Sequence, residues 1–136
     1  SRIRPSETVE NIRRYNMFGI NLSMPYKEAV IPFLDEISPA AQLIGAVNTV
    51  VNRDGHLIGH NTDGFGFFAS LKNFSPRDAH LTILGAGGAA KAIVTQAVLD
   101  DAKKSVSTFA LSHWIRQKKV LSPYLNRQLA NWSFML

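Results

Sequence analysis

The chain lacks several features that would assign it to a specialised class of protein. It has no cysteine among its 136 residues, so neither a disulfide framework nor a thiolate metal site can form. No apolar run reaches the roughly 18 residues of a membrane-spanning helix. Residues 1–7 contain no apolar h-region, so we expect no signal peptide. With 46% hydrophobic and 18% charged residues, the composition is that of a soluble globular protein, and a cytoplasmic location is the simplest expectation.

Acidic residues are missing from the last quarter of the chain. Residues 1–101 carry nine Lys or Arg and ten Asp or Glu, whereas residues 102–136 carry six Lys or Arg and no acid. The formal net charge of +5 therefore comes from the C-terminal segment alone. Such a segment can bind an anionic cofactor or nucleic acid, or it can be a divergent or frameshifted end. It contains no recognised nucleic-acid-binding module, so we do not expect nucleic-acid binding.

Helical and strand patterns alternate along the chain and predict an α/β fold. The expected helices cover residues 7–15, with Ser6 as N-cap, 27–36, 38–43, 63–73 and 89–99. The expected strands cover residues 17–23, 46–52, 56–59, 81–84 (a buried strand) and 105–111. Asp54-Gly55 between two of these strands is a strong hairpin signal. The turn at residues 75–78 is suited to a domain boundary.

Residues 85–90, Gly-Ala-Gly-Gly-Ala-Ala, lie between an expected strand and an expected helix. In a GxGxxA turn the first glycine permits the turn and the second lets a pyrophosphate approach the backbone. The N-terminus of the following helix offers N–H groups to the phosphates. We therefore expect a dinucleotide-binding turn formed by Gly85, Ala86, Gly87, Gly88 and Ala89. A glycine turn selected for close packing alone is the alternative.

The acid that usually follows such a turn by about 20 residues, and holds the ribose 2′-OH of NAD, is absent. Residues 110–116 contain no Asp or Glu. Ser112 and Arg116 in this stretch are instead suited to a 2′-phosphate. The sequence therefore favours NADP over NAD and adds Ser112 and Arg116 to the expected cofactor site.

Lys27 and Asp63 are the candidates for proton transfer. Lys27 follows an expected strand and a proline-containing turn, and Asp63 begins an expected helix. From these positions alone, a solvated lysine and a helix-capping aspartate are the more frequent explanations. His56 and His60 are four residues apart, but the neighbouring glycines argue against one helix, so we expect no metal site.

Four motifs together resemble those of the shikimate dehydrogenase family. They are G-x-N-x-S-x-P-x-K at residues 19–27, G-A-V-N-T at 45–49, N-T-D-G at 61–64 and G-A-G-G-A at 85–89. Their order and spacing agree with the family over about residues 1–110. The resemblance implies that Lys27 and Asp63 form the catalytic pair. It also implies that Ser23 and Asn48 bind substrate hydroxyls while Asn21 supports the same loop.

The resemblance implies a two-domain arrangement. Residues 1–77 would be the C-terminal part of a substrate-binding domain, and residues 78–136 the N-terminal part of a Rossmann-like NADP-binding domain with an atypical tail. The family's N-terminal serine pair and its later cofactor strands are not found, and we expect residues from 112 onward to lie outside the resemblance.

The implied reaction is the NADP-dependent, reversible oxidation of shikimate to 3-dehydroshikimate, a step of the chorismate pathway in aromatic amino-acid biosynthesis. A quinate/shikimate dehydrogenase that uses NAD is one alternative, and an inactive truncated fragment of the family is another. The expected partner is a small-molecule substrate rather than a membrane. A homodimer is compatible with the sequence.

Overall fold

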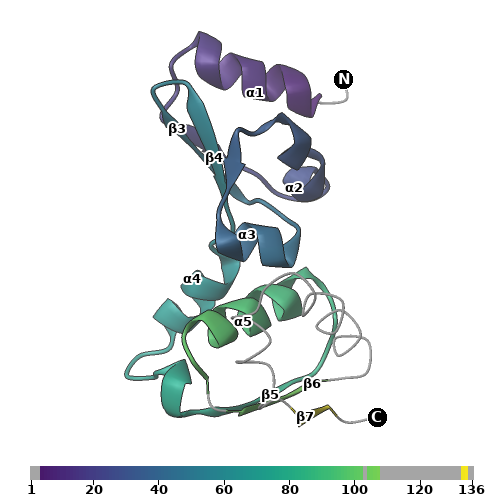
Figure 1. The fold of residues 1–136 in the computed structure, drawn as a ribbon, viewed down its shortest axis with the longest axis vertical. Coiled ribbons are helices and arrows are strands. Elements are labelled where there is room, and N and C mark those ends of the chain that lie inside the picture. Colours follow the sequence, from purple (N-terminus) through teal and green to yellow (C-terminus); the bar gives the residue numbers. More distant parts are fainter. Residues whose placement is uncertain (1–3, 103, 108–132, 135–136) are drawn as a thin grey trace. The chain divides into compact units, whose positions relative to one another are not determined.

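The computed structural model describes residues 4–102, 104–107 and 133–134, and the chain divides into two compact units, Ser1–Thr62 and Asp63–Leu136 (Figure 1). The predicted division at residues 77 and 78 concerns substrate and cofactor domains, and it stays a prediction. Ser112 and Arg116 lie outside the described residues. In the described part of the chain, no helix is long and apolar enough to cross a membrane.

The first unit contains a four-stranded sheet of order β1-β3-β4-β2. Its strands are β1 (Gly19–Asn21), β2 (Glu36–Ile37), β3 (Thr49–Arg53) and β4 (His56–His60). β3 is antiparallel to both β1 and β4, whereas β2 runs parallel to β4. The predicted hairpin is confirmed, and Asp54 and Gly55 at its turn have φ values of 52° and 91°. Positive φ values at both central residues are what a two-residue hairpin turn of type I′ requires.

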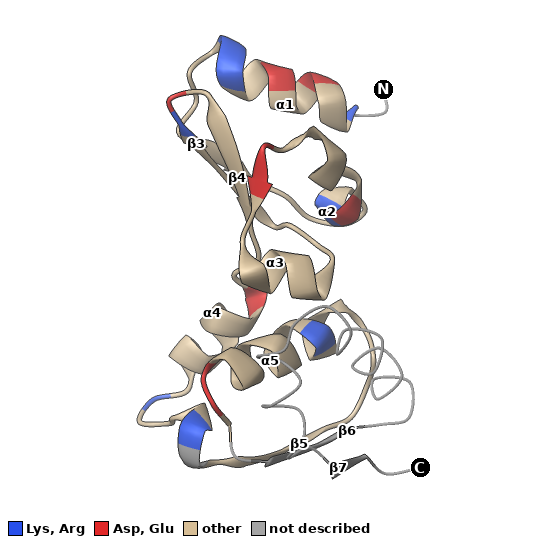
Figure 2. Cartoon of the chain, viewed as in Figure 1, with Lys and Arg blue, Asp and Glu red and all other residues tan. Residues whose placement is uncertain are grey.

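Helix α1 (Pro5–Arg14) begins two residues earlier than predicted. Pro5 occupies its first turn, where a missing N–H costs no hydrogen bond, so Arg4 is the N-cap and Ser6 lies inside the helix. The N-cap prediction for Ser6 was therefore wrong. The helix carries an acid in its first turn and two arginines in its last, which complements the helix dipole (Figure 2).

The helix predicted at residues 27–36 was wrong in its length. The structure has a short helix α2 (Tyr26–Ala29), a 3-10 turn η1 (Ile31–Phe33) and then β2. Pro32 lacks an N–H and its ring crowds the carbonyl four residues earlier, so an α-helix cannot run through it. The next predicted helix is confirmed as α3 (Pro39–Ile44), where the Ser38 hydroxyl accepts a hydrogen bond from the Ala41 N–H at 3.3 Å.

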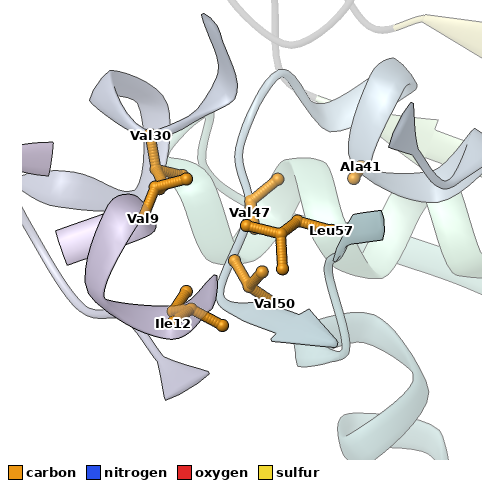
Figure 3. Close-up of a cluster of buried hydrophobic side chains, with 7 residues drawn as sticks. All are labelled: Val9, Ile12, Val30, Ala41, Val47, Val50 and Leu57. Atoms are coloured by element: carbon orange, nitrogen blue, oxygen red, sulfur yellow. The ribbon is translucent and has the colours of Figure 1, made fainter. Parts of the chain in front are cut away.

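A cluster of buried aliphatic side chains forms the core of the first unit (Figure 3). Val9 and Ile12, predicted to face inward from the first helix, are both buried. The full cluster is Val9, Ile12, Val30, Ala41, Val47, Val50 and Leu57. Five of these seven are 0% exposed (Ile12, Ala41, Val47, Val50 and Leu57), so α1, α3 and the hairpin share one tightly packed core.

An ion pair fastens α1 to the strands. The Arg13 guanidinium donates through Nη2 to Asp35 Oδ2 at 2.7 Å and through Nε to the Gly55 carbonyl at 3.0 Å. The same Asp35 oxygen accepts from the Leu57 N–H at 2.7 Å. These two hydrogen bonds hold the pKa of Asp35 below its ordinary value of 3.8, and the bond from the Leu57 N–H has the larger effect.

The second unit begins with α4 (Asp63–Ser70) and the 3-10 turn η2 (Pro76–Asp78). A parallel sheet follows, of order β5-β6-β7, with helix α5 (Gly88–Leu99) connecting its first two strands. Its strands are β5 (His80–Ile83), β6 (Lys104–Ser107) and β7 (Ser133–Phe134). This β5-α5-β6 unit confirms the predicted strand–turn–helix–strand order, and residues 108–111 of the predicted second strand lie outside the described residues.

Two details of the second unit differ from the prediction. Helix α4 ends at Ser70 rather than residue 73, where Asn73 has a φ of 58° that no α-helix contains. The strand β5 is not fully buried as expected. Its burial alternates residue by residue, the pattern of a strand with one covered face.

Candidate active site

The sheet register of the first unit brings the sequence-distant motifs to one row of residues. Asn21, the last residue of β1, pairs with Thr49, the first residue of β3. Thr49 pairs in turn with His60, the last residue of β4, which directly precedes Asn61 and Thr62. Since directly opposite residues of neighbouring strands project to the same face, the row brings Asn21 and Thr49, from two of the predicted motifs, to one end of the sheet. The third motif begins directly after the row, at Asn61.

The Asn48 side chain, 8% exposed, lies beside this row in a defined orientation. Its Oδ1 accepts from the Thr62 N–H at 3.1 Å, and its Nδ2 donates to Thr62 Oγ1 at 3.2 Å. A backbone N–H can only donate, so this contact decides which end of the Asn48 amide is oxygen. The backbone is held equally well, because the Asn48 N–H donates to the His60 carbonyl at 2.9 Å and its carbonyl accepts from the Leu22 N–H at 2.7 Å.

Thr49 connects Asn48 with Asn21. Its Oγ1 is 3.0 Å from Asn48 Oδ1 and 3.3 Å from Asn21 Oδ1. The two amides predicted to serve the substrate site are therefore brought together through one hydroxyl. Sequence reasoning assigned no role to Thr49 or Thr62, although both stand inside the quoted motifs.

Ser23 and Lys27 occupy the loop and helix that follow β1. The Ser23 carbonyl accepts from the Tyr26 N–H at 2.9 Å, which closes the turn into α2. The Lys27 carbonyl accepts from the Val47 N–H at 2.8 Å, so the main chain at Lys27 lies against the segment that leads into Asn48. Lys27 is half-buried and Ser23 is exposed.

A pocket of about 350 Å³ opens beside Ser23. Asn21, Ser23 and Tyr26 supply polar groups to its lining, and the remaining lining residues are Pro5, Thr8, Ile20, Leu22 and Val30. This mixture of an apolar wall and a few polar groups is typical of a small-molecule site. Lys27 and Asn48 are not among its lining residues.

Asp63 is the first residue of α4 and thus belongs to the second compact unit. An acid in the first turn is favourable at the positive end of the helix dipole, which is the structural explanation that the sequence left open. The pairing of Asp63 with Lys27 stays a prediction. Within the described ranges, no three His, Asp or Glu residues are grouped as a metal site would need.

The glycine turn joins β5 to α5 as predicted. Gly85 has a φ of 127°, a conformation that side chains disfavour, and Gly87 is the N-cap of α5 without a side-chain cap. Among the described residues, a Cβ added to Gly85, Gly87 or Gly88 would meet no atom within 4 Å. The turn therefore has open space beside its backbone, as close approach of a diphosphate would require, and cofactor binding there stays a prediction.

Comparison with known proteins found similar sequences and similar solved structures. The family model of the shikimate dehydrogenase substrate binding domain matches residues 4–50. A shikimate dehydrogenase (NADP(+)) of Streptococcus thermophilus is 87% identical over 99 residues, which is 73% of this chain and 35% of that protein. One from Streptococcus pneumoniae is 58% identical over 122 residues, which is 90% of this chain and 42% of that protein.

A match of 122 residues in a chain of 136 must reach at least residue 122, so the expectation that residues from 112 onward lie outside the resemblance was wrong for residues 112–122. Among solved structures, shikimate 5-dehydrogenase from Listeria monocytogenes in complex with shikimate and NAD has a TM-score of 0.80 and 37% identity. The structural match covers 96% of this chain and 46% of the Listeria chain. The chain thus spans less than half the length of each of these relatives.

Proposed function

Since this chain belongs to the shikimate dehydrogenase family, we propose that the complete protein catalyses the NADP-dependent, reversible oxidation of shikimate to 3-dehydroshikimate. The step belongs to aromatic amino-acid biosynthesis, and we place it in the cytoplasm. The observation that carries the proposal is the meeting of Asn21 and Asn48 through Thr49, because it connects two family-matched amides, of which Asn21 lines a pocket.

Each candidate site residue would have its own role in the reaction. Lys27 and Asp63 would exchange the proton of the reacting hydroxyl, a role that a neighbouring amine and carboxylate can fill. Asn48 and Ser23 would bind substrate hydroxyls, and Asn21 would support their loop. The buried Asn48 amide is suited to this role because its oxygen and nitrogen cannot exchange places without breaking its bonds to Thr62.

The turn at Gly85–Ala89 would hold the pyrophosphate of the cofactor, which supplies hydride transfer when bound. Its open glycine backbone and the start of α5 support this assignment. NADP is proposed over NAD because no acid follows Asp101 to hold a ribose 2′-OH, and because the curated relatives are named for NADP. The Listeria structure holds NAD, so an NAD-using shikimate or quinate dehydrogenase is the second candidate.

The proposal is tested with Lys27→Ala and Asp63→Ala in a complete form of the protein. Each change should lower kcat for shikimate oxidation by about 10²- to 10⁴-fold, the usual contribution of a positioned acid–base group. Lys72→Ala, which removes an exposed lysine from the loop after α4, is the matched control and should leave kcat unchanged. Near-normal turnover of either Lys27→Ala or Asp63→Ala would contradict the assigned roles.

A further inference from the structure

We propose that Thr49 is a positioning residue that couples the substrate-binding amides of Asn21 and Asn48, an inference that rests on the proposed function. Thr49 is half-buried, and it stands in the middle of the row formed with Asn21 and His60. Its backbone is fixed by strand pairing on both sides. Its hydroxyl therefore has a defined place between the two amides.

The hydrogen-bonding capacity of this hydroxyl decides what it does. A threonine hydroxyl has one hydrogen, and both Asn48 Oδ1 at 3.0 Å and Asn21 Oδ1 at 3.3 Å lie within hydrogen-bonding distance of it. One hydrogen therefore serves two acceptors. A stronger bond to one carbonyl oxygen weakens the bond to the other, so the orientations of the two amides depend on each other.

The two amides differ in how firmly they are held. Asn48 is buried, and Thr62 holds both ends of its amide, whereas Asn21 is exposed at the end of β1. The Thr49 hydroxyl thus transmits the fixed orientation of Asn48 to Asn21, which lines the pocket together with Ser23. Removing the hydroxyl should release Asn21 first, whereas Asn48 keeps its hydrogen bonds to Thr62.

Three variants separate this role from simple packing. Thr49→Val keeps the shape and the strand preference of threonine but has no hydroxyl, whereas Thr49→Ser keeps the hydroxyl. Thr82→Val removes the hydroxyl of an exposed threonine in β5 and is the matched control. If the valine variant does not fold, Thr49→Ala is the second variant that lacks the hydroxyl.

The first readout is the side-chain amide spectrum of the 136-residue chain in ¹⁵N-labelled form. Thr49→Val should shift the Nδ2 resonances of Asn21 and Asn48 and speed their hydrogen exchange, while Thr49→Ser and Thr82→Val should not. This readout needs no substrate, so it remains decisive for Thr49 even if shikimate proves not to be the substrate. Unshifted Asn21 and Asn48 resonances in Thr49→Val would overturn the proposal.

The second readout is kinetic and uses a complete form of the protein. Thr49→Val should raise KM for shikimate by about 3- to 10-fold, the effect of one lost hydrogen bond, with KM for NADP unchanged. Thr49→Ser should restore KM to within about twofold. In a double-mutant cycle, the coupling between Asn21→Ala and Asn48→Ala should disappear in the Thr49→Val background. Failure of serine to restore KM, or coupling that survives valine, would overturn the proposal.

Discussion

Gly64, the second residue of α4, should not tolerate even a methyl group. A Cβ at this position would lie 2.3 Å from the Ala92 carbonyl oxygen, 2.9 Å from its carbon and 2.7 Å from Gln96 Cβ. Two of these three atoms are backbone atoms of α5, which cannot rotate away as a side chain could. Gly64→Ala must therefore push α4 and α5 apart, and such overpacking costs about 1–3 kcal/mol.

Gly66, two residues later in the same helix, is the matched control. A Cβ there would meet no atom of the described part of the chain within 4 Å, and the position is exposed. Exchanging glycine for alanine inside a helix is worth up to about 1 kcal/mol, and both variants share this gain. The difference between them therefore isolates the packing cost, so Gly64→Ala should be about 1–3 kcal/mol less stable than Gly66→Ala.

Two measurements check the difference. Thermal unfolding followed by circular dichroism should give Gly64→Ala a midpoint at least about 4 °C below that of Gly66→Ala. The reason is that 1 kcal/mol shifts the midpoint of a domain of about 60–100 residues by about 4–8 °C, and the second unit falls in that size range. Hydrogen exchange of the α5 amides should be faster in Gly64→Ala and unchanged or slower in Gly66→Ala. Equal midpoints, or equal protection of α5, would refute the close approach of α4 to α5.

Three further outcomes are expected. Asp35→Asn should destabilise the chain at neutral pH, because it removes the ion pair with Arg13. Since the pKa of Asp35 is lowered in the folded state, denaturant titrations should show the stability difference from the unchanged protein shrinking as the pH falls below 3.8. A stability difference independent of pH would show that the charge of Asp35 does not matter. In a complete form of the protein, a fluorescence titration should give tighter binding of NADP than of NAD, and equal or tighter binding of NAD would refute the preference argued from the missing acid. The isolated 136-residue chain, which spans less than half of its relatives, should oxidise neither shikimate nor quinate measurably with either cofactor; turnover within about tenfold of a full-length relative, or 1.4 kcal/mol in barrier, would show that the remaining segments are dispensable.

Local chemistry made part of the fold predictable. Asp54-Gly55 fixed the hairpin because few residues accept the backbone conformation that its turn requires. Ser38 before Pro39 fixed the start of α3, because a hydroxyl cap and a proline in the first turn agree. The β5-α5-β6 unit followed from a glycine turn placed between an apolar strand and a helix.

The stretch after Lys27 could not be predicted from local pattern. Its apolar residues Val30, Ile31 and Leu34 have helical spacing, but Pro32 divides the helix and the next residues form β2. Strand β2 is only two residues long, and it exists because Glu36 and Ile37 pair with a strand more than twenty residues away. A prediction from the residues near Glu36 and Ile37 cannot include their pairing partner, β4.

The candidate site shows the same division. The motifs pointed to Asn21 and Asn48 through the family resemblance. The part played by Thr49 depends on the register between β1, β3 and β4, because it is this register that sets its hydroxyl between two amides. A one-residue slip would turn Thr49 to the opposite face of the sheet.

The row of Asn21, Thr49 and His60 also has an entropic consequence. Fixing the backbone of one residue costs about 1–2 kcal/mol, and here that cost is met when the sheet folds rather than when a ligand arrives. A substrate would thus meet groups whose main chain has already lost its freedom, so the ordering cost on the protein side of this row comes from its side chains. We expect affinity at this end of the sheet to vary little with changes that loosen the second unit. It should fall sharply with changes that fray the end of β1, because β1 lies at the edge of the sheet that the described residues form, and β3 is its neighbour there.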